Sequence, residues 1–144
     1  MGEMTVEAKA LQGAAFFAGL SQEDIGGILQ VGRPVSFEPG QAMVEQGDAG
    51  DGMYIIVSGT AEVDVGGRFH KLTTGDFFGE MALFTTGRRM ATVKAVEPVR
   101  ALTIPSEGFQ SFLLEHPGVA LSMLKAIVQR LREVEQRIDA WMAS

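Results

Sequence analysis

The chain has 144 residues, the length of one ordinary domain, and a formal net charge of −6 at pH 7. This acidic balance disfavours general nucleic-acid binding, which needs clustered Lys and Arg, but it permits an anionic ligand at a local positive group. The chain has no cysteine, which excludes disulfides and thiolate metal sites, and no apolar run approaches the ~20 residues of a membrane-spanning helix. With no signal peptide visible in residues 1–10, a cytoplasmic location is expected.

Two helices are predicted at the N-terminal end, within residues 5–31. The first covers Val6–Phe17, an apolar stretch with few helix breakers. The second covers Ser21–Val31, where Ser21 is expected to be the N-cap and acidic residues follow in the first turn. Ile25 and Ile28 fall on one face of that helix, so this face is expected to be buried.

Between residues 33 and 104 the spacing of apolar residues changes to every second position, and turn residues recur every few positions. The pair Gly66-Gly67 is a strong signal for a two-residue hairpin. About six to eight short strands are expected, which predicts an antiparallel roll or barrel. The segments are Val35–Phe37, Ala42–Val44, Met53–Val57, Thr60–Val65, Arg68–Leu72, Ala91–Val96 and Val99–Ile104.

Residues 106–143 are predicted to be helical. Ser106 is the expected N-cap of a helix over Glu107–Glu115, His116-Pro117-Gly118 is expected to break it, and Val119–Ala143 forms a long final helix. We expect a single domain over residues 1–144, because no linker, repeat or low-complexity tract interrupts the chain.

The final helix carries an apolar stripe with the 3-and-4 spacing of a coiled-coil seam. Such a stripe fits either one helix packed on its own roll or a pairing between two chains. We favour a homodimer, since the far end of the stripe outreaches a small roll. The stripe consists of Leu124, Ile127, Leu131, Val134, Ile138 and Trp141.

The segment over residues 75–93 contains the most informative chemistry. Gly79 lets the backbone approach a ligand closely, and Glu80–Leu83 is interpreted as one helical turn whose first N–H groups suit an anion. Arg89 follows Gly79 by ten positions and can offer its guanidinium to the same anion. The carboxylate of Glu80 fits such a site only if it accepts from a hydroxyl. A phosphate joined to a sugar satisfies both groups.

This segment resembles the phosphate-binding cassette of the cyclic nucleotide-binding domain family. The likeness rests on Phe78-Gly79-Glu80-Met81-Ala82-Leu83, followed at family spacing by Arg89-Met90-Ala91-Thr92, and it extends over roughly residues 10–140. The resemblance implies an α+β fold: an antiparallel β-roll (a double-stranded β-helix or jelly roll) with N-terminal helices and C-terminal hinge and lid helices.

The resemblance also implies roles for individual residues. Glu80 accepts from the ribose 2′-hydroxyl, and Arg89 pairs with the cyclic phosphate. Met90 replaces the Ser or Thr that many members carry, which favours cAMP over cGMP as the ligand. Backbone groups of Gly79, Met81, Ala82, Met90 and Ala91 line the sugar and phosphate, Val63, Phe69 and Leu72 face the base, and Arg130, Leu131 and Val134 of the final helix meet its edge.

The expected function is therefore a sensor that binds a cyclic nucleotide, cAMP or alternatively cGMP, and whose final helix responds to the ligand. We expect no catalytic residue, metal or other cofactor, and no direct contact with nucleic acid or membrane. A regulatory fragment of a larger transcription factor, channel or kinase is the main alternative.

Two further interpretations are weaker. Asp76 and Glu80 could be paired acids of a cyclic-nucleotide hydrolase, yet no nucleophile or histidine stands near them in the sequence. A metal site of the cupin type would have to use His70 and His116, which lie far apart in the sequence. Arg88 is interpreted as a solvated turn residue.

Overall fold

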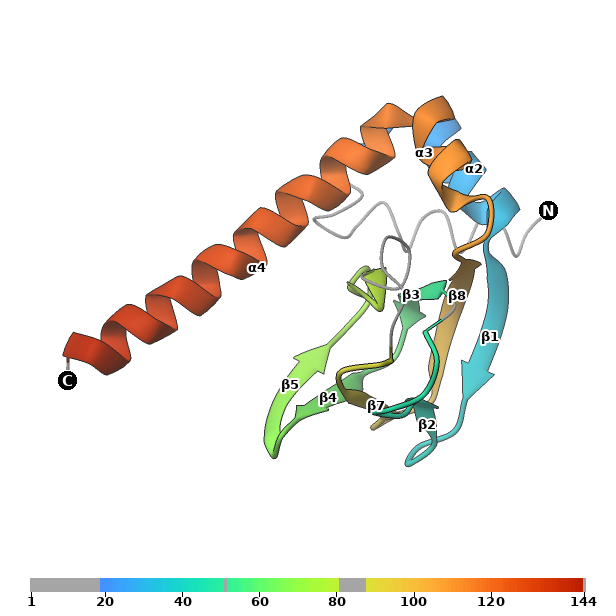
Figure 1. Ribbon diagram of the computed structural model, residues 1–144. Coiled ribbons are helices and arrows are strands. Elements are labelled where there is room, and N and C mark those ends of the chain that lie inside the picture. Colours follow the sequence, from blue (N-terminus) through green and yellow to red (C-terminus); the bar gives the residue numbers. More distant parts are fainter. Residues whose placement is uncertain (1–18, 51, 81–87, 144) are drawn as a thin grey trace.

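The structure, a computed structural model, describes residues 19–50, 52–80 and 88–143. Two four-stranded antiparallel sheets face each other as a roll, and helices lie at one end of it (Figure 1). One sheet has the order β1 (Arg33–Phe37), β8 (Val99–Pro105), β3 (Gly52–Ser58), β6 (Phe77–Phe78). The other has the order β2 (Ala42–Val44), β7 (Thr92–Ala95), β4 (Ala61–Val65), β5 (Arg68–Leu72). The helices are α2 (Gln22–Val31), α3 (Phe109–Glu115) and α4 (Pro117–Ala143). The predicted β-roll with flanking helices is confirmed.

Helix α2 forms as the sequence predicts. The Ser21 side chain accepts a hydrogen bond from the backbone N–H of Asp24 at 3.1 Å, so it satisfies one of the free donors of the first turn. Ile25 and Ile28 are buried, as expected from their spacing. The helix predicted over Val6–Phe17 lies outside the described residues.

The roll contains two apolar cores, one on each face of the sheet that holds β3. Side chains alternate along a strand, so Ile55 and Val57 join the core against the helices, whereas Ile56 joins the core between the two sheets. Because both of its faces are covered, β3 is apolar at nearly every position. This is the physical reason for the uninterrupted run in the sequence.

The hairpin between β4 and β5 turns at the predicted glycine pair. Gly66 and Gly67 have φ of 60° and 85°, the left-handed conformation that a type I′ turn needs at both positions. This tight turn sets the register, in which Val63 faces His70 and Ala61 faces Leu72. The register decides which side chains of β5 point into the roll.

Two predicted boundaries at the C-terminal end are wrong. Helix α3 begins at Phe109, with Gly108 at its N-terminal boundary, because the Ser106 carbonyl closes a turn by accepting from Phe109 N–H at 3.2 Å. The predicted break after Glu115 is present at His116, but α4 begins at Pro117 and not at Val119, since a proline lacks only an N–H that is unsatisfied in a first turn anyway. In the described part of the chain no single helix is long and apolar enough to span a membrane. One pair, Phe109–Glu115 with Pro117–Gln136, reaches that length only across a bend of 108°.

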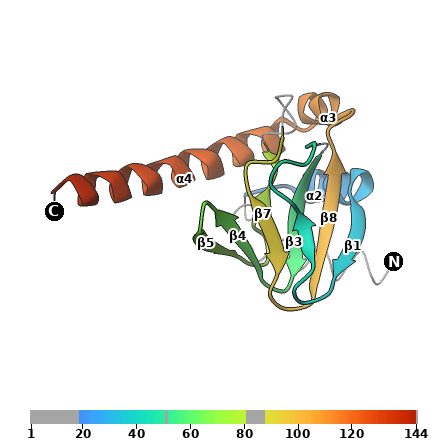
Figure 2. The same cartoon turned by 60° about the horizontal axis from the view of Figure 1, so that its bottom comes forward.

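Helix α4 has two apolar faces with different neighbours. Val119 and Met123 are buried in the core next to the helices, and Ala126 packs against the same core. Leu124 and Leu131 of the predicted seam lie on another face, with exposed fractions of 57% and 56%. Figure 2 shows α4 continuing past the roll toward its C-terminal end. These two leucines therefore do not pack on the chain's own roll.

Candidate functional site

The backbone of Arg89 is held by a turn from a distant part of the chain. Gly47 N–H donates to the Arg89 carbonyl at 2.9 Å, and Arg89 N–H donates to the Asp48 carbonyl at 2.7 Å. Arg88 forms an isolated bridge with Ala49 beside this contact. Arg89 therefore lies beside a bridged residue, ahead of β7. The turn Gln46-Gly47-Asp48 thus acquires a positioning role.

The guanidinium of Arg89 lies against Gly52 of β3 and next to Gly79, which follows β6. Its Nη2 donates to the Gly52 carbonyl at 2.8 Å, and its Cζ lies 6.0 Å from the ring centroid of Tyr54. Gly79 has φ of 82°, and a Cβ added there would collide with Nη1 of Arg89. Only glycine fits this position, because both the conformation and the close approach exclude a side chain.

Glu80 and the final helix meet next to this guanidinium. Arg130 of α4 donates from Nη1 to Glu80 Oε1 at 3.3 Å and from Nη2 to the Phe77 carbonyl at 2.6 Å. Its Cζ also lies 4.2 Å from the Phe77 ring, within the range of a cation–π contact. Arg130 thus joins α4 directly to the segment that carries Glu80.

The residues predicted to face the base fall on two sides of their sheet. Val63 and Leu72 both pack against the core inside the roll. Phe69 pairs with Asp64 on the opposite face and is 59% exposed, so the structure does not bring it together with the other two. Alternation along the strand instead places His70 on the face of Val63. The sequence analysis did not include His70, although a two-residue turn at Gly66-Gly67 already fixes which residues of β4 and β5 pair, including Val63 with His70.

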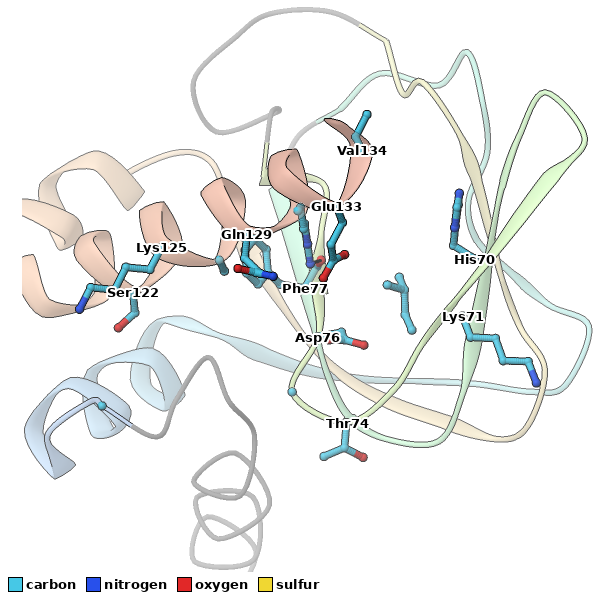
Figure 3. Close-up of a pocket in the computed structure, with 15 residues that line it drawn as sticks. His70, Lys71, Thr74, Asp76, Phe77, Ser122, Lys125, Gln129, Glu133 and Val134 are labelled. Carbon is cyan, nitrogen blue, oxygen red and sulfur yellow. Dashed lines mark hydrogen bonds between the residues drawn. The ribbon is translucent and has the colours of Figure 1, made fainter. Parts of the chain in front are cut away.

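A groove of about 860 Å³ separates β5 and the following turn from α4 (Figure 3). Leu72, Arg130 and Val134, three of the predicted site residues, line it together. His70 from β5 and Glu133 from α4 line it as well, and neither was predicted. Leu131 points elsewhere, since it does not line the groove and is more than half exposed.

The remaining predicted residues are more peripheral or lie outside the description. Met90 is 70% exposed, and Ala91 is half-buried. Met81 and Ala82, with the predicted helical turn they belong to, lie outside the described residues. Arg88 is exposed and donates to the Gly47 carbonyl at 2.7 Å, as a turn residue does.

The two weaker interpretations depend on Asp76 and on the two histidines, and the structure places each of these side chains. Asp76 Oδ2 accepts from Thr73 N–H at 2.8 Å and closes the turn before β6, so this carboxylate is engaged within its own loop. His70 lies on β5, whereas His116 joins α3 to α4. Over residues 19–50, 52–80 and 88–143, no three His, Cys, Asp or Glu side chains gather as a metal site.

Comparison with known proteins identifies the family to which this fold and this cassette belong. The profile of the cyclic nucleotide-binding domain family matches residues 34–116. The chain is 28% identical over 131 residues to a CRP-like cAMP-activated global transcriptional regulator of Mycobacterium tuberculosis, covering 87% of this chain and 58% of the relative. It is 41% identical over 97 residues to a cGMP-dependent protein kinase of Toxoplasma gondii, covering 65% of this chain and 10% of the kinase.

The fold has a solved counterpart in the catabolite activator protein of Thermus thermophilus. That structure superimposes with a TM-score of 0.77 at 29% identity, over 88% of this chain and 62% of the other. The chain spans less than two thirds of each of these three relatives. The family profile covers more than half of the chain and includes Gly79, Glu80 and Arg89. This chain belongs to the cyclic nucleotide-binding domain family.

Proposed function

We propose that this chain is a sensor domain that binds cAMP inside its β-roll and passes the binding event to α4. The observation that carries the proposal is the arrangement around Gly79. On one side of this glycine lies the guanidinium of Arg89, and directly after it comes the carboxylate of Glu80. A cation and an acceptor side by side match a phosphate diester whose ring is fused to a ribose with one free hydroxyl.

Each part of the ligand has a matching group in this arrangement. The cyclic phosphate pairs with Arg89, and the ribose 2′-hydroxyl donates to Glu80. The purine lies against Val63 and Leu72, toward the groove that His70 and Val134 also border. Apolar walls with a few polar groups at the rim are the usual lining of such a pocket.

Arg130 provides the route from the ligand to the helix. Its side chain is 38% exposed, and its guanidinium contacts both Glu80 and the Phe77 carbonyl. A ligand hydroxyl that donates to Glu80 changes the partners of this carboxylate and thereby the free energy of docking α4 on the roll. A ligand that interacts differently with two positions of a helix shifts the population between them.

Calorimetric titration with cAMP and cGMP side by side tests the ligand. We expect cAMP to bind at least as tightly as cGMP, because Met90 offers no side-chain hydroxyl to the guanine amino group, and Met90→Thr is expected to shift the ratio toward cGMP. A tenfold preference of the parent chain for cGMP, about 1.4 kcal/mol, would refute the choice of cAMP. No binding of either nucleotide at millimolar concentration would refute the proposed function.

The ribose contact is tested by Glu80→Gln, which keeps the size of the side chain and removes its charge. The parent is expected to bind 2′-deoxy-cAMP more weakly than cAMP, since a carboxylate accepts from a hydroxyl more strongly than an amide does. In Glu80→Gln the two ligands should bind with nearly equal affinity. If both proteins lose the same factor on removal of the hydroxyl, Glu80 does not contact the sugar.

We further propose that two chains pair through the seam face of α4. Leu124, Ile127 and Leu131 do not line the groove, and each is at least 37% exposed in the isolated chain, whereas Val134 borders the groove as well as the seam. Their spacing of three and four residues suits knobs-into-holes packing between two parallel helices. The roll already occupies the face of α4 that carries Val119 and Met123, and Val134 is the seam residue that also borders the groove.

A binding role without catalysis is also part of this proposal. Asp76 closes its own turn and Glu80 pairs with Arg130, so neither of the two acids is arranged as a general acid or base. The ligand is then the nucleotide itself, with no further cofactor, and a cytoplasmic location agrees with a chain that has no cysteine. Incubation with cAMP and chromatography of the nucleotide would reveal any hydrolysis.

A further inference from the structure

The sharp elbow between α3 and α4 contains a polar contact that the ligand site does not use. Helix α3 ends at Glu115 and α4 begins at Pro117, with a bend of 108° between them. His116 is the single residue at the corner. Its backbone closes the elbow, since His116 N–H donates to the Phe112 carbonyl at 2.9 Å and the His116 carbonyl accepts from Val119 N–H at 3.0 Å.

The side chain of His116 reaches across to α2. Its Nδ1 lies 3.0 Å from Oδ1 of Asp24, and the two side chains are only 15% and 18% exposed. The imidazole also packs on the ring of Phe112, with 4.6 Å between the ring centroids. A contact with this much shielding holds its geometry better than an ion pair on the open surface does.

Two glycines allow the three helices to approach this closely. A Cβ on Gly27 of α2 would lie 3.0 Å from the imidazole of His116. A Cβ on Gly118 of α4 would lie 2.6 Å from Oδ2 of Asp24. The carboxylate of Asp24 therefore rests against the first turn of α4, where the helix dipole favours a negative charge, while its other oxygen faces His116.

We propose that Asp24 and His116 form a clamp that fixes the direction of α4 relative to α2 and the roll. The clamp lies at one end of a long lever, because Arg130 is about 21 Å beyond the elbow at a rise of about 1.5 Å per residue. A tilt of about 5° at the elbow moves Arg130 by about 2 Å, enough to break its 2.6 Å hydrogen bond to the Phe77 carbonyl. The clamp thus controls whether α4 reaches the ligand site.

The first test measures the direction of α4 and does not depend on the ligand. The natural chain has no cysteine, so Lys94→Cys on β7 and Arg132→Cys on α4 introduce two unique positions for spin labels, both exposed. Distances are measured in the full chain, diluted with unlabelled protein so that only one labelled chain occurs in a dimer. His116→Ala and Asp24→Ala are each expected to broaden the distance distribution, whereas Glu23→Ala, the neighbouring acid of the same turn, leaves it unchanged.

The second test measures cAMP affinity, and this part rests on the proposed function. His116→Ala and Asp24→Ala are each expected to weaken cAMP binding about 5- to 20-fold. The double variant is expected to bind cAMP no more weakly than the weaker-binding of the two single variants, because each substitution removes the same contact. His116→Asn keeps a donor close to the position of Nδ1 and is expected to bind within threefold of the parent. Where an alanine variant unfolds, Asp24→Asn, which removes the charge and keeps the size of the side chain, takes its place as the variant that weakens the contact.

The outcomes separate the clamp from the proposed function. If the parent does not bind cAMP, the proposed function fails, while the distance measurement still decides on the clamp. An unchanged distance distribution in both alanine variants refutes the clamp. Losses in affinity that multiply in the double variant refute it too, because they show that Asp24 and His116 act independently.

Discussion

Replacement of Arg89 with alanine is expected to weaken cAMP binding by about 2–5 kcal/mol, which is roughly 30-fold or more in Kd. The physical reason is the loss of the cation opposite the cyclic phosphate in a partly buried site, where few other positive groups can replace it. Arg89 is held on both sides, through its backbone by the turn Gln46-Gly47-Asp48 and through Nη2 by the Gly52 carbonyl. Calorimetric titration of the folded variant measures the effect.

Arg88→Ala is the matched control for this variant. The neighbouring arginine has the same charge, but it is exposed and donates to the Gly47 carbonyl. Its removal is expected to change the Kd by less than about threefold, or about 0.7 kcal/mol, as for other exposed charges. Equal affinities of the parent and Arg89→Ala, with circular dichroism showing both folded, would mean that the phosphate binds elsewhere.

Leu124→Glu combined with Leu131→Glu is expected to convert the proposed dimer to a folded monomer. Both leucines are more than half exposed in the isolated chain, so the substitutions leave the roll intact. In a dimer each buried leucine contributes about 1.5–3 kcal/mol, and the two-fold symmetry counts every substitution twice. We expect the dimer Kd to rise at least about 100-fold, which is about 2.7 kcal/mol.

The control for the seam places the same charges on other exposed apolar residues. Leu114 on α3 is 84% exposed and Val65 in the β4–β5 hairpin is 47% exposed. Leu114→Glu with Val65→Glu should therefore leave the mass in solution unchanged. Light scattering of the parent, with and without cAMP, is the decisive measurement. A parent that stays monomeric at high micromolar concentration would exclude the pairing and leave α4 as a lid alone.

Different residues of α4 contact the chain's own roll and form the proposed seam between two chains. Val119, Met123 and Arg130 meet the chain's own roll, while Leu124 and Leu131 face away from it. A change in the direction of α4 at the elbow therefore moves the seam together with Arg130. In a dimer, the ligand-dependent position of Arg130 would alter how the two seams meet, which gives the sensor a means of output.

Much of the fold could be predicted from local patterns. The cap of α2 at Ser21, the hairpin at Gly66-Gly67 and the alternating strands all depend on neighbours within a few residues. The boundaries at Ser106 and Pro117 were predicted less well. The reason is that Ser106 serves a turn through its backbone, and Pro117 at a first helical position loses no hydrogen bond.

The sequence by itself determined the family and its cassette, because Phe78–Glu80 and Arg89–Thr92 are a local motif whose spacing is independent of the packing around it. Only the tertiary structure decided which other groups join it. The β4–β5 register places His70 on the face of Val63 and Phe69 on the opposite face, and the elbow at His116 directs Arg130 onto Glu80, fifty positions earlier in the chain. The clamp between Asp24 and His116 spans an even longer separation. Such contacts depend on how whole elements are oriented in space, and the periodicity within a single element contains no information about that orientation.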